Sequence, residues 1–139
     1  MRVVGADWAA KQWAYVVLDD GVVVEVAATA EFATMAAKFS GAAAIAVDIP
    51  VGLPEVPPRT ADEAARSLIG GSTVFPTYPR TIYECATHQE AVAVCRAKGW
   101  PGISRQSFGL WARIREVAPH AAEVHEVHPE VSFWAMNGH

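Results

Sequence analysis

The chain has no long apolar segment. Its opening apolar run stops at Asp7, and no later run approaches the roughly 20 apolar residues that cross a bilayer. We therefore expect neither secretion nor a membrane span, and we predict a cytoplasmic protein.

Cysteine is also scarce. Cys85 and Cys95 lie in a stretch with helical periodicity, where about 100° per residue places them on different faces, so we expect no disulfide. His88 follows Cys85 by one turn, but no second Cys/His pair has matching spacing. The sequence therefore does not favour a zinc site.

Basic residues are few outside the middle of the chain. Residues 1–58 hold three basic and seven acidic residues, residues 59–115 hold eight basic and four acidic residues, and the remainder holds four acids. The net charge of −4 argues against a protein that coats nucleic acid over its whole surface. The basic helical segment, 59–116, predicts either a surface that receives nucleic acid or a solvated charged face.

At 139 residues, of which 52% are hydrophobic, the chain is long enough for one sizeable core. We therefore expect a single domain over residues 1–139. Repeats and low-complexity tracts are absent, and we expect the five tryptophans to lie in the core rather than to stack on bases.

Hydrophobic patterning predicts a mixed α/β sheet. Strands are expected at residues 3–7, 13–18, 22–26, 42–48 and 123–128. Asp20-Gly21 predicts a hairpin turn between the second and third strands. Helices are expected at residues 31–39, 61–69, 81–98 and 104–116. For the second helix, Thr60 is the expected cap, Glu63 has the capping-box position, and Gly70-Gly71 ends the helix. This order is typical of an RNase H-like sheet: a three-stranded antiparallel meander plus two strands parallel to the first, with a helical insertion before the last strand.

Asp7, Asp48 and Glu126 each lie at or near the carboxyl end of a predicted strand. Ligands bind outside these ends in open α/β sheets, and clustered carboxylates repel one another unless a cation separates them. Hard oxygen donors suit Mg²⁺ or Mn²⁺, so the sequence predicts a divalent-metal centre that hydrolyses phosphodiester bonds. The plainer interpretation is that these acids merely end strands.

Two further residues lie at the end of the last predicted strand and just after it. Glu130 is a candidate fourth carboxylate if a helix starts there. His128, taken alone, is more typical of a hydrogen-bonded structural histidine than of a Mg²⁺ ligand.

Five motifs together resemble an uncharacterised family of predicted RNase H-like nucleases, family 429 of the domain-of-unknown-function series. They are Gly5–Trp8, Val47–Pro54, Val74–Arg80, Gly102–Gln106 and Glu126–Phe133. The resemblance implies an acidic centre of Asp7, Asp48 and Glu126. It also singles out Arg59, Asp62, Arg66, Arg80, Ser104, Gln106, His128 and Glu130.

Of these residues we expect Arg59, Arg66, Arg80, Ser104, Gln106 and His128 to bind substrate. Arg80, in a proline-bounded loop, is placed to hold a phosphate. For Arg66 an ion pair with Asp62, one turn earlier, is an equal alternative.

Family members continue beyond the last motif, whereas this chain ends at His139. We therefore expect either a shortened chain or reduced activity, and an uncovered sheet face would favour a homodimer. A catalytically silent module that binds nucleic acid or protein is the main alternative to a nuclease. An actin-like phosphotransferase is disfavoured, because no glycine-rich turn follows Asp7 to approach a phosphate.

Overall fold

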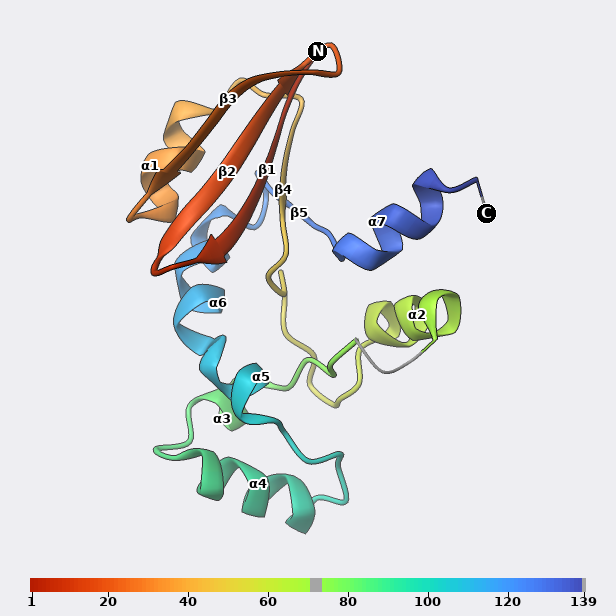
Figure 1. The fold of residues 1–139 in the computed structure, drawn as a ribbon. Helices are drawn as coiled ribbons and strands as arrows, with labels where there is room; N and C mark the ends of the chain where they lie inside the picture. Colours follow the sequence, from red (N-terminus) through yellow and green to blue (C-terminus); the bar gives the residue numbers. More distant parts are fainter. Residues whose placement is uncertain (71–73, 139) are drawn as a thin grey trace. The chain divides into compact units, whose positions relative to one another are not determined.

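The computed structural model describes residues 1–70 and 74–138 (Figure 1). The chain packs as two compact units, each built from two separate stretches. Met1–Val51 and Arg113–Val127 form the first, here called the sheet unit, and Gly52–Ala112 and His128–His139 form the second, the helical unit. Neither unit is continuous in sequence, so the prediction of one domain stays a prediction.

The sheet unit contains the predicted mixed α/β sheet. Its strands are β1 (Arg2–Ala9), β2 (Gln12–Asp19), β3 (Val22–Thr29), β4 (Ala44–Val47) and β5 (His125–Glu126), in the order β3-β2-β1-β4-β5. The first three form an antiparallel meander, β4 runs parallel to β1, and β5 runs parallel to β4. The RNase H-like arrangement of strands is therefore confirmed.

Two tight turns connect the meander. The predicted Asp20-Gly21 turn has φ values of 49° and 81°, the left-handed pair that suits a two-residue hairpin. The turn between β1 and β2 uses Ala10 and Lys11 at φ 50° and 63°, although neither residue favours that conformation.

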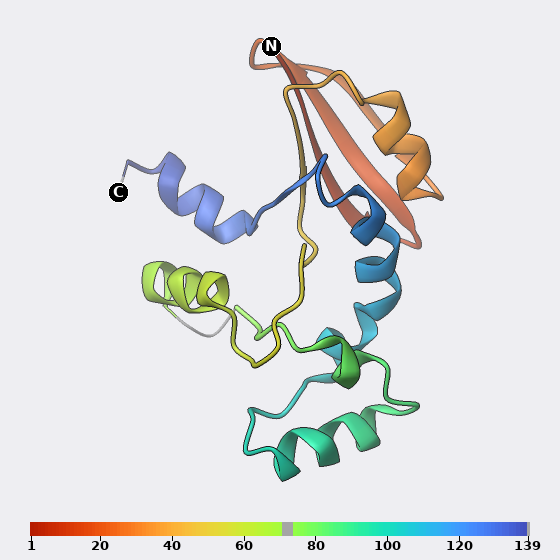
Figure 2. The same ribbon diagram turned by 180° about the vertical axis from the view of Figure 1, so that it is seen from behind.

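One face of the sheet forms the core of this unit. Helix α1 (Phe32–Lys38) lies alongside β3 in both views, and α6 (Trp111–Val117) enters this unit from Arg113 onwards (Figures 1 and 2). The buried side chains include Val4, Ala6, Trp13, Tyr15, Val17, Phe32, Met35, Ala36, Ile45, Val47, Ile114 and Val117. Because side chains alternate along a strand, the intervening residues face the other way, among them the exposed Gly5, Asp7, Ala14 and Val26.

The outer strand β3 is irregular. Glu25 is opposite Val17 and Val23 is opposite Leu18, so Val24 is an extra residue in β3 and forms a β-bulge. The valines at 22, 23, 24 and 26 are between 54% and 71% exposed. The outer strand thus combines apolar exposure with a break in its regular pairing.

The helical unit contains α2 (Thr60–Ile69), α3 (Arg80–Tyr83), α4 (His88–Ala97), α5 (Arg105–Gly109) and α7 (Pro129–Met136). Helices α2 and α7 lie side by side in both views (Figures 1 and 2). The buried side chains of this unit include Tyr78, Ile82, Tyr83, Ala91, Cys95 and Ile103. None of the helices in the described residues is long and apolar enough to cross a membrane.

Two predicted helices are each divided. Instead of one helix over 81–98 there are α3 and α4, because Thr87 caps α4: its hydroxyl accepts a hydrogen bond from the Glu90 N–H at 3.1 Å. The carboxylate of Glu90 reaches back to the Ala86 N–H at 2.9 Å. Cys85 therefore lies in the turn between the helices, and both cysteines are free thiols. The predicted helix 104–116 is likewise replaced by α5 and α6.

Helix α2 begins one residue earlier than predicted. Thr60 is its first residue and Arg59 its cap, so the third helical position is Asp62 rather than Glu63. Gly70 ends the helix in the left-handed conformation at φ 78°, and Gly71 lies outside the described residues.

Candidate functional site

Asp7 lies in β1, and Asp48 directly follows the last residue of the neighbouring parallel strand β4. Ala6 of β1 is paired with Val47 of β4, both side chains are buried, and each is followed directly by one of the two acids. Strand alternation directs Asp7 to the face opposite Ala6, and both acids are exposed. The two acids therefore lie at the same end of the paired strands β1 and β4.

The Asp7 carboxylate is fixed by its own backbone. Its Oδ1 atom accepts a hydrogen bond from the Trp8 N–H at 2.7 Å. This bond orients the carboxylate without burying it.

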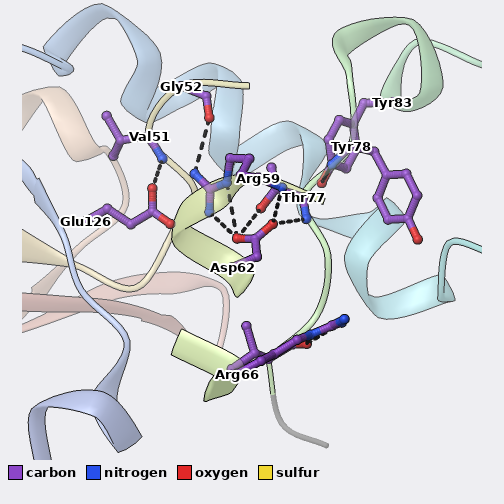
Figure 3. Close-up of polar contacts among 10 residues, drawn as sticks. Val51, Gly52, Arg59, Asp62, Arg66, Thr77, Tyr78, Tyr83 and Glu126 are labelled. Carbon is purple, nitrogen blue, oxygen red and sulfur yellow. Dashed lines mark hydrogen bonds and ion pairs between the residues drawn. The ribbon is translucent and has the colours of Figure 1, made fainter. Parts of the chain in front are cut away.

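Glu126 lies in β5, the strand next to β4, and its register position differs from that of Asp48. It is paired with the buried Val47 and not with Asp48, so its register position belongs to the core-facing row. Its Oε2 atom accepts a hydrogen bond from the Val51 N–H at 2.7 Å (Figure 3). The carboxylate thereby holds the chain that leaves β4 just after Asp48.

Glu130 is the second residue of α7, so the chain does turn into a helix there as the sequence analysis required. It is exposed and belongs to the helical unit. Across residues 1–70 and 74–138, no group of three or more His, Cys, Asp or Glu side chains is arranged to hold a metal ion. The assignment of Glu126 and Glu130 as metal ligands stays a prediction.

Arg59, Asp62 and Thr77 form a polar network in the helical unit (Figure 3). Asp62 is 4% exposed, and its Oδ1 accepts hydrogen bonds from Arg59 Nε at 3.1 Å and Nη2 at 2.7 Å. Its Oδ2 accepts from the Arg59 N–H at 3.3 Å and the Thr77 N–H at 2.8 Å. Arg59 Nη1 also donates to the Gly52 carbonyl at 3.3 Å. The network ties the start of α2 to two loop segments.

Arg66 does not pair with Asp62. Its Nε and Nη2 atoms donate to the Val74 carbonyl at 3.0 and 2.8 Å (Figure 3). The ion pair considered for Arg66 is therefore absent from the described residues, because Arg59 takes its place.

Arg80 begins α3 and keeps its guanidinium in solvent. Its side chain is 60% exposed, pairs with Glu84 at 3.4 Å, and lies 5.2 Å from the centre of the Trp111 ring. Among the predicted substrate-binding arginines it is the most accessible in the described chain.

The remaining predicted substrate-binding residues lie at helix starts. Ser104 caps α5 by accepting from the Ser107 N–H at 3.0 Å, and Gln106 is exposed on that helix. His128 precedes α7, and its Nδ1 atom is buried without a hydrogen-bond partner among the described residues. Their role in substrate binding stays a prediction.

Burial shapes the chemistry of Tyr78, which lies next to Thr77. It raises the pKa of Tyr78 to about 12, so the phenol stays neutral, and its hydroxyl donates to the Pro101 and Gly102 carbonyls, both at 3.1 Å. Burial also raises the pKa of Tyr83. Both phenols therefore ionise less readily than an exposed tyrosine does.

The sequence analysis missed the residues that support these sites. Thr77 lies 15 residues from Asp62, and Glu116 lies 103 residues from Trp13, with which it forms a hydrogen bond at 3.0 Å. No local spacing signals such pairs. The motif Val74–Arg80 was the one available indication that Thr77 matters.

Residues 5–139 match the family described as "Protein of unknown function (DUF429)", and the chain belongs to that family. The family membership expected from the motifs is thereby confirmed, and the nuclease activity stays a prediction. Comparison with curated proteins and comparison with solved structures both give no match.

Proposed function

We propose that this member of the family is a divalent-metal-dependent phosphodiesterase that acts on nucleic acid, with Asp7 and Asp48 as metal ligands. One observation carries the proposal: Ala6 and Val47 are paired on parallel strands, and each is followed in the chain by an exposed aspartate. The strand order, in which β1 is the central strand and β4 is its parallel neighbour, supports it.

The donor set fits a hard cation. Two carboxylates at the carboxyl ends of adjacent strands offer oxygen ligands of the kind that Mg²⁺ and Mn²⁺ prefer. When bound, such an ion lowers the pKa of a ligating water and neutralises charge on a phosphodiester. Asp7 presents its carboxylate in an orientation set by the Trp8 N–H, and Glu126 holds the segment that follows Asp48.

Arg80 is the arginine that we assign to substrate phosphate. Its guanidinium is exposed and its ion pair with Glu84 is long at 3.4 Å, so an incoming phosphate can displace that partner at little cost. Arg59 and Arg66 are instead bonded to Asp62 and to the Val74 carbonyl, so for them we propose a supporting role.

A module that binds nucleic acid or protein without turnover is the second candidate. Glu126 favours it, because its carboxylate accepts a hydrogen bond from the Val51 N–H and so holds the chain itself. A homodimer also stays a prediction.

Metal binding is tested first, by titrating the full chain with Mn²⁺ and following free Mn²⁺ by electron paramagnetic resonance. We expect Asp7→Asn and Asp48→Asn each to weaken binding at least about tenfold, since each removes a charged ligand. The matched control is Asp20→Asn, which removes an exposed acid of the same unit in the β2–β3 turn. Wild-type protein that binds no Mn²⁺ at millimolar concentration, or equal losses in all three variants, would contradict the proposal.

Activity is tested on single-stranded, duplex, hybrid and branched nucleic acids with Mg²⁺ or Mn²⁺. We expect cleavage by the wild type and at least a hundredfold loss in Asp7→Asn. Metal binding without cleavage would favour the binding module, and cleavage that persists in Asp7→Asn would rule out the proposed centre.

A further inference from the structure

A stacked group of side chains lies directly behind Asp7 on the core side of β1. The guanidinium of Arg113, from α6, is 3.9 Å from the centre of the Trp8 ring. Arg113 Nη1 also donates to Glu116 Oε2 at 2.5 Å, and the two charged side chains are only 23% and 24% exposed. We call Trp8, Arg113 and Glu116 the Trp8 stack.

Glu116 fixes this stack to the rest of the sheet unit. Its Oε1 accepts hydrogen bonds from Trp13 Nε1 at 3.0 Å and from the Phe32 N–H at 2.9 Å. One carboxylate therefore links α6 to β2 and to the start of α1. Arg113 is consequently bound to a carboxylate that is itself bonded to β2 and α1.

The Trp8 ring is restrained on a second side. It meets the buried Trp13 edge-on, with ring centres 5.5 Å apart. A stacked guanidinium and an edge-on aromatic contact each stabilise one orientation of the ring beyond what burial alone does. The orientation of Trp8 is thus determined by contacts from both α6 and β2.

Trp8 and Asp7 are joined by one peptide and by the 2.7 Å hydrogen bond from the Trp8 N–H to Asp7 Oδ1. Strand alternation places the Trp8 ring on the core face and the Asp7 carboxylate on the open face. Any rotation of the Trp8 backbone therefore moves the hydrogen bond that orients Asp7.

We propose that Trp8, held by Arg113 and Glu116, is a positioning residue that sets the direction of the Asp7 carboxylate for cation binding. The part of the inference that concerns cation binding rests on the proposed function. The part that concerns the orientation of Asp7 rests only on its hydrogen bond with the Trp8 N–H. Arg113 and Glu116 are not ligands; they act through Trp8.

The test uses the full chain and variants that loosen the stack by different amounts. Arg113→Gln removes the cation from the Trp8 ring and from Glu116, while Arg113→Lys restores a cation. Trp8→Leu removes the ring, while Trp8→Phe keeps an aromatic surface. The matched control is Lys38→Gln, because Lys38 also pairs with a carboxylate, Glu25, and lies 5.4 and 5.0 Å from the Tyr15 and Phe39 rings.

Two measurements are made on each protein. Without metal, hydrogen exchange of the backbone amide of residue 8 is followed by NMR. We expect this exchange to be at least about tenfold faster in Arg113→Gln and Trp8→Leu than in the wild type. We expect a smaller increase in Arg113→Lys and Trp8→Phe, and no change in Lys38→Gln. With Mn²⁺, we expect about tenfold weaker binding in the first two variants and wild-type binding in the control.

The outcomes separate this inference from the proposed function. Wild-type Mn²⁺ binding with equal amide exchange and equal affinity in Arg113→Gln and Lys38→Gln would overturn the positioning role and leave the metal centre intact. Faster amide exchange without any loss of affinity would overturn the link to the cation. Absence of Mn²⁺ binding in the wild type would contradict the proposed function, and the inference with it.

Discussion

Asp62 shows at the scale of one residue how a buried charge is accommodated. Its carboxylate is 4% exposed and accepts hydrogen bonds from both the side chain and the backbone of Arg59, and from Thr77. A buried carboxylate with this many donors is stable only while the partners stay in place.

Replacing Asp62 with Asn should therefore be costly. The change removes the negative charge that Asp62 places beside the Arg59 side chain, which is 14% exposed, and we expect a loss of about 3 kcal/mol in the free energy of unfolding. Urea unfolding measures it. Glu84→Gln, which breaks the exposed Arg80 pair, is the control and should cost less than about 1 kcal/mol. Equal losses in the two variants would show that burial of the pair is unimportant.

The position of a single residue can be predicted from the sequence where it depends only on neighbouring residues in the chain. Asp7 and Asp48 follow buried strand residues, as the end of an apolar run predicts. Such prediction does less well where distant segments compete. Glu63 fits the capping-box spacing after Thr60, yet Asp62 takes the position because Arg59 and Thr77 bind it.

Thr87 matters at the scale of a helix, because it separates α3 from α4. Its hydroxyl accepts from the Glu90 N–H, one of the first N–H groups of α4, which have no partner within the helix. We expect Thr87→Ala to lower the free energy of unfolding by about 1 kcal/mol, and Thr87→Ser to restore most of it.

Thr81→Ala is the control for that change, measured by the same thermal or urea unfolding. Thr81 is exposed within α3, so its replacement should change stability by less than about 0.5 kcal/mol. A loss as large as that in Thr87→Ala would indicate a general effect of removing threonine from this segment.

The periodicity of apolar residues predicts most of the strands and helices, but it does not predict where a helix is interrupted. The apolar pattern continues across residues 84–87, so a periodicity argument extends one helix through them. Thr87 and Glu90 have the spacing of a capping box, which is the signal that identifies the break. The turn at Ala10 and Lys11 has no such signal, because neither residue favours a left-handed backbone.

At the scale of the whole chain, the charge of each folded unit differs from the charge of the sequence segments counted in order. The sheet unit holds five basic and nine acidic residues, and the helical unit holds six of each. The basic segment 59–115 is thus divided between the units and partly neutralised by Asp62, Glu84 and Glu116. Counting charge along the chain could not reveal this, because folding decides which charges become neighbours.

Alkaline pH should destabilise the whole fold through Tyr78. Burial raises its pKa from 10.0 to about 12, so the folded state favours the neutral phenol. This contribution to stability is fully present below pH 10 and is lost as the pH rises through about 12. We expect the free energy of unfolding of Tyr78→Phe to fall less steeply than that of the wild type between these limits, as measured by urea unfolding at successive pH values. Parallel curves for the two proteins would contradict the assignment.

The bulge at Val24 affects how copies of the chain behave towards one another. Along an outer strand, unpaired N–H and C=O groups form a template on which another strand can grow, and the exposed valines of β3 would favour that growth. The extra residue interrupts the regular spacing of those groups, so an added strand loses its register at Val24. We therefore expect the bulge to disfavour fibril-like stacking at high concentration on a strand that carries neither proline nor lysine.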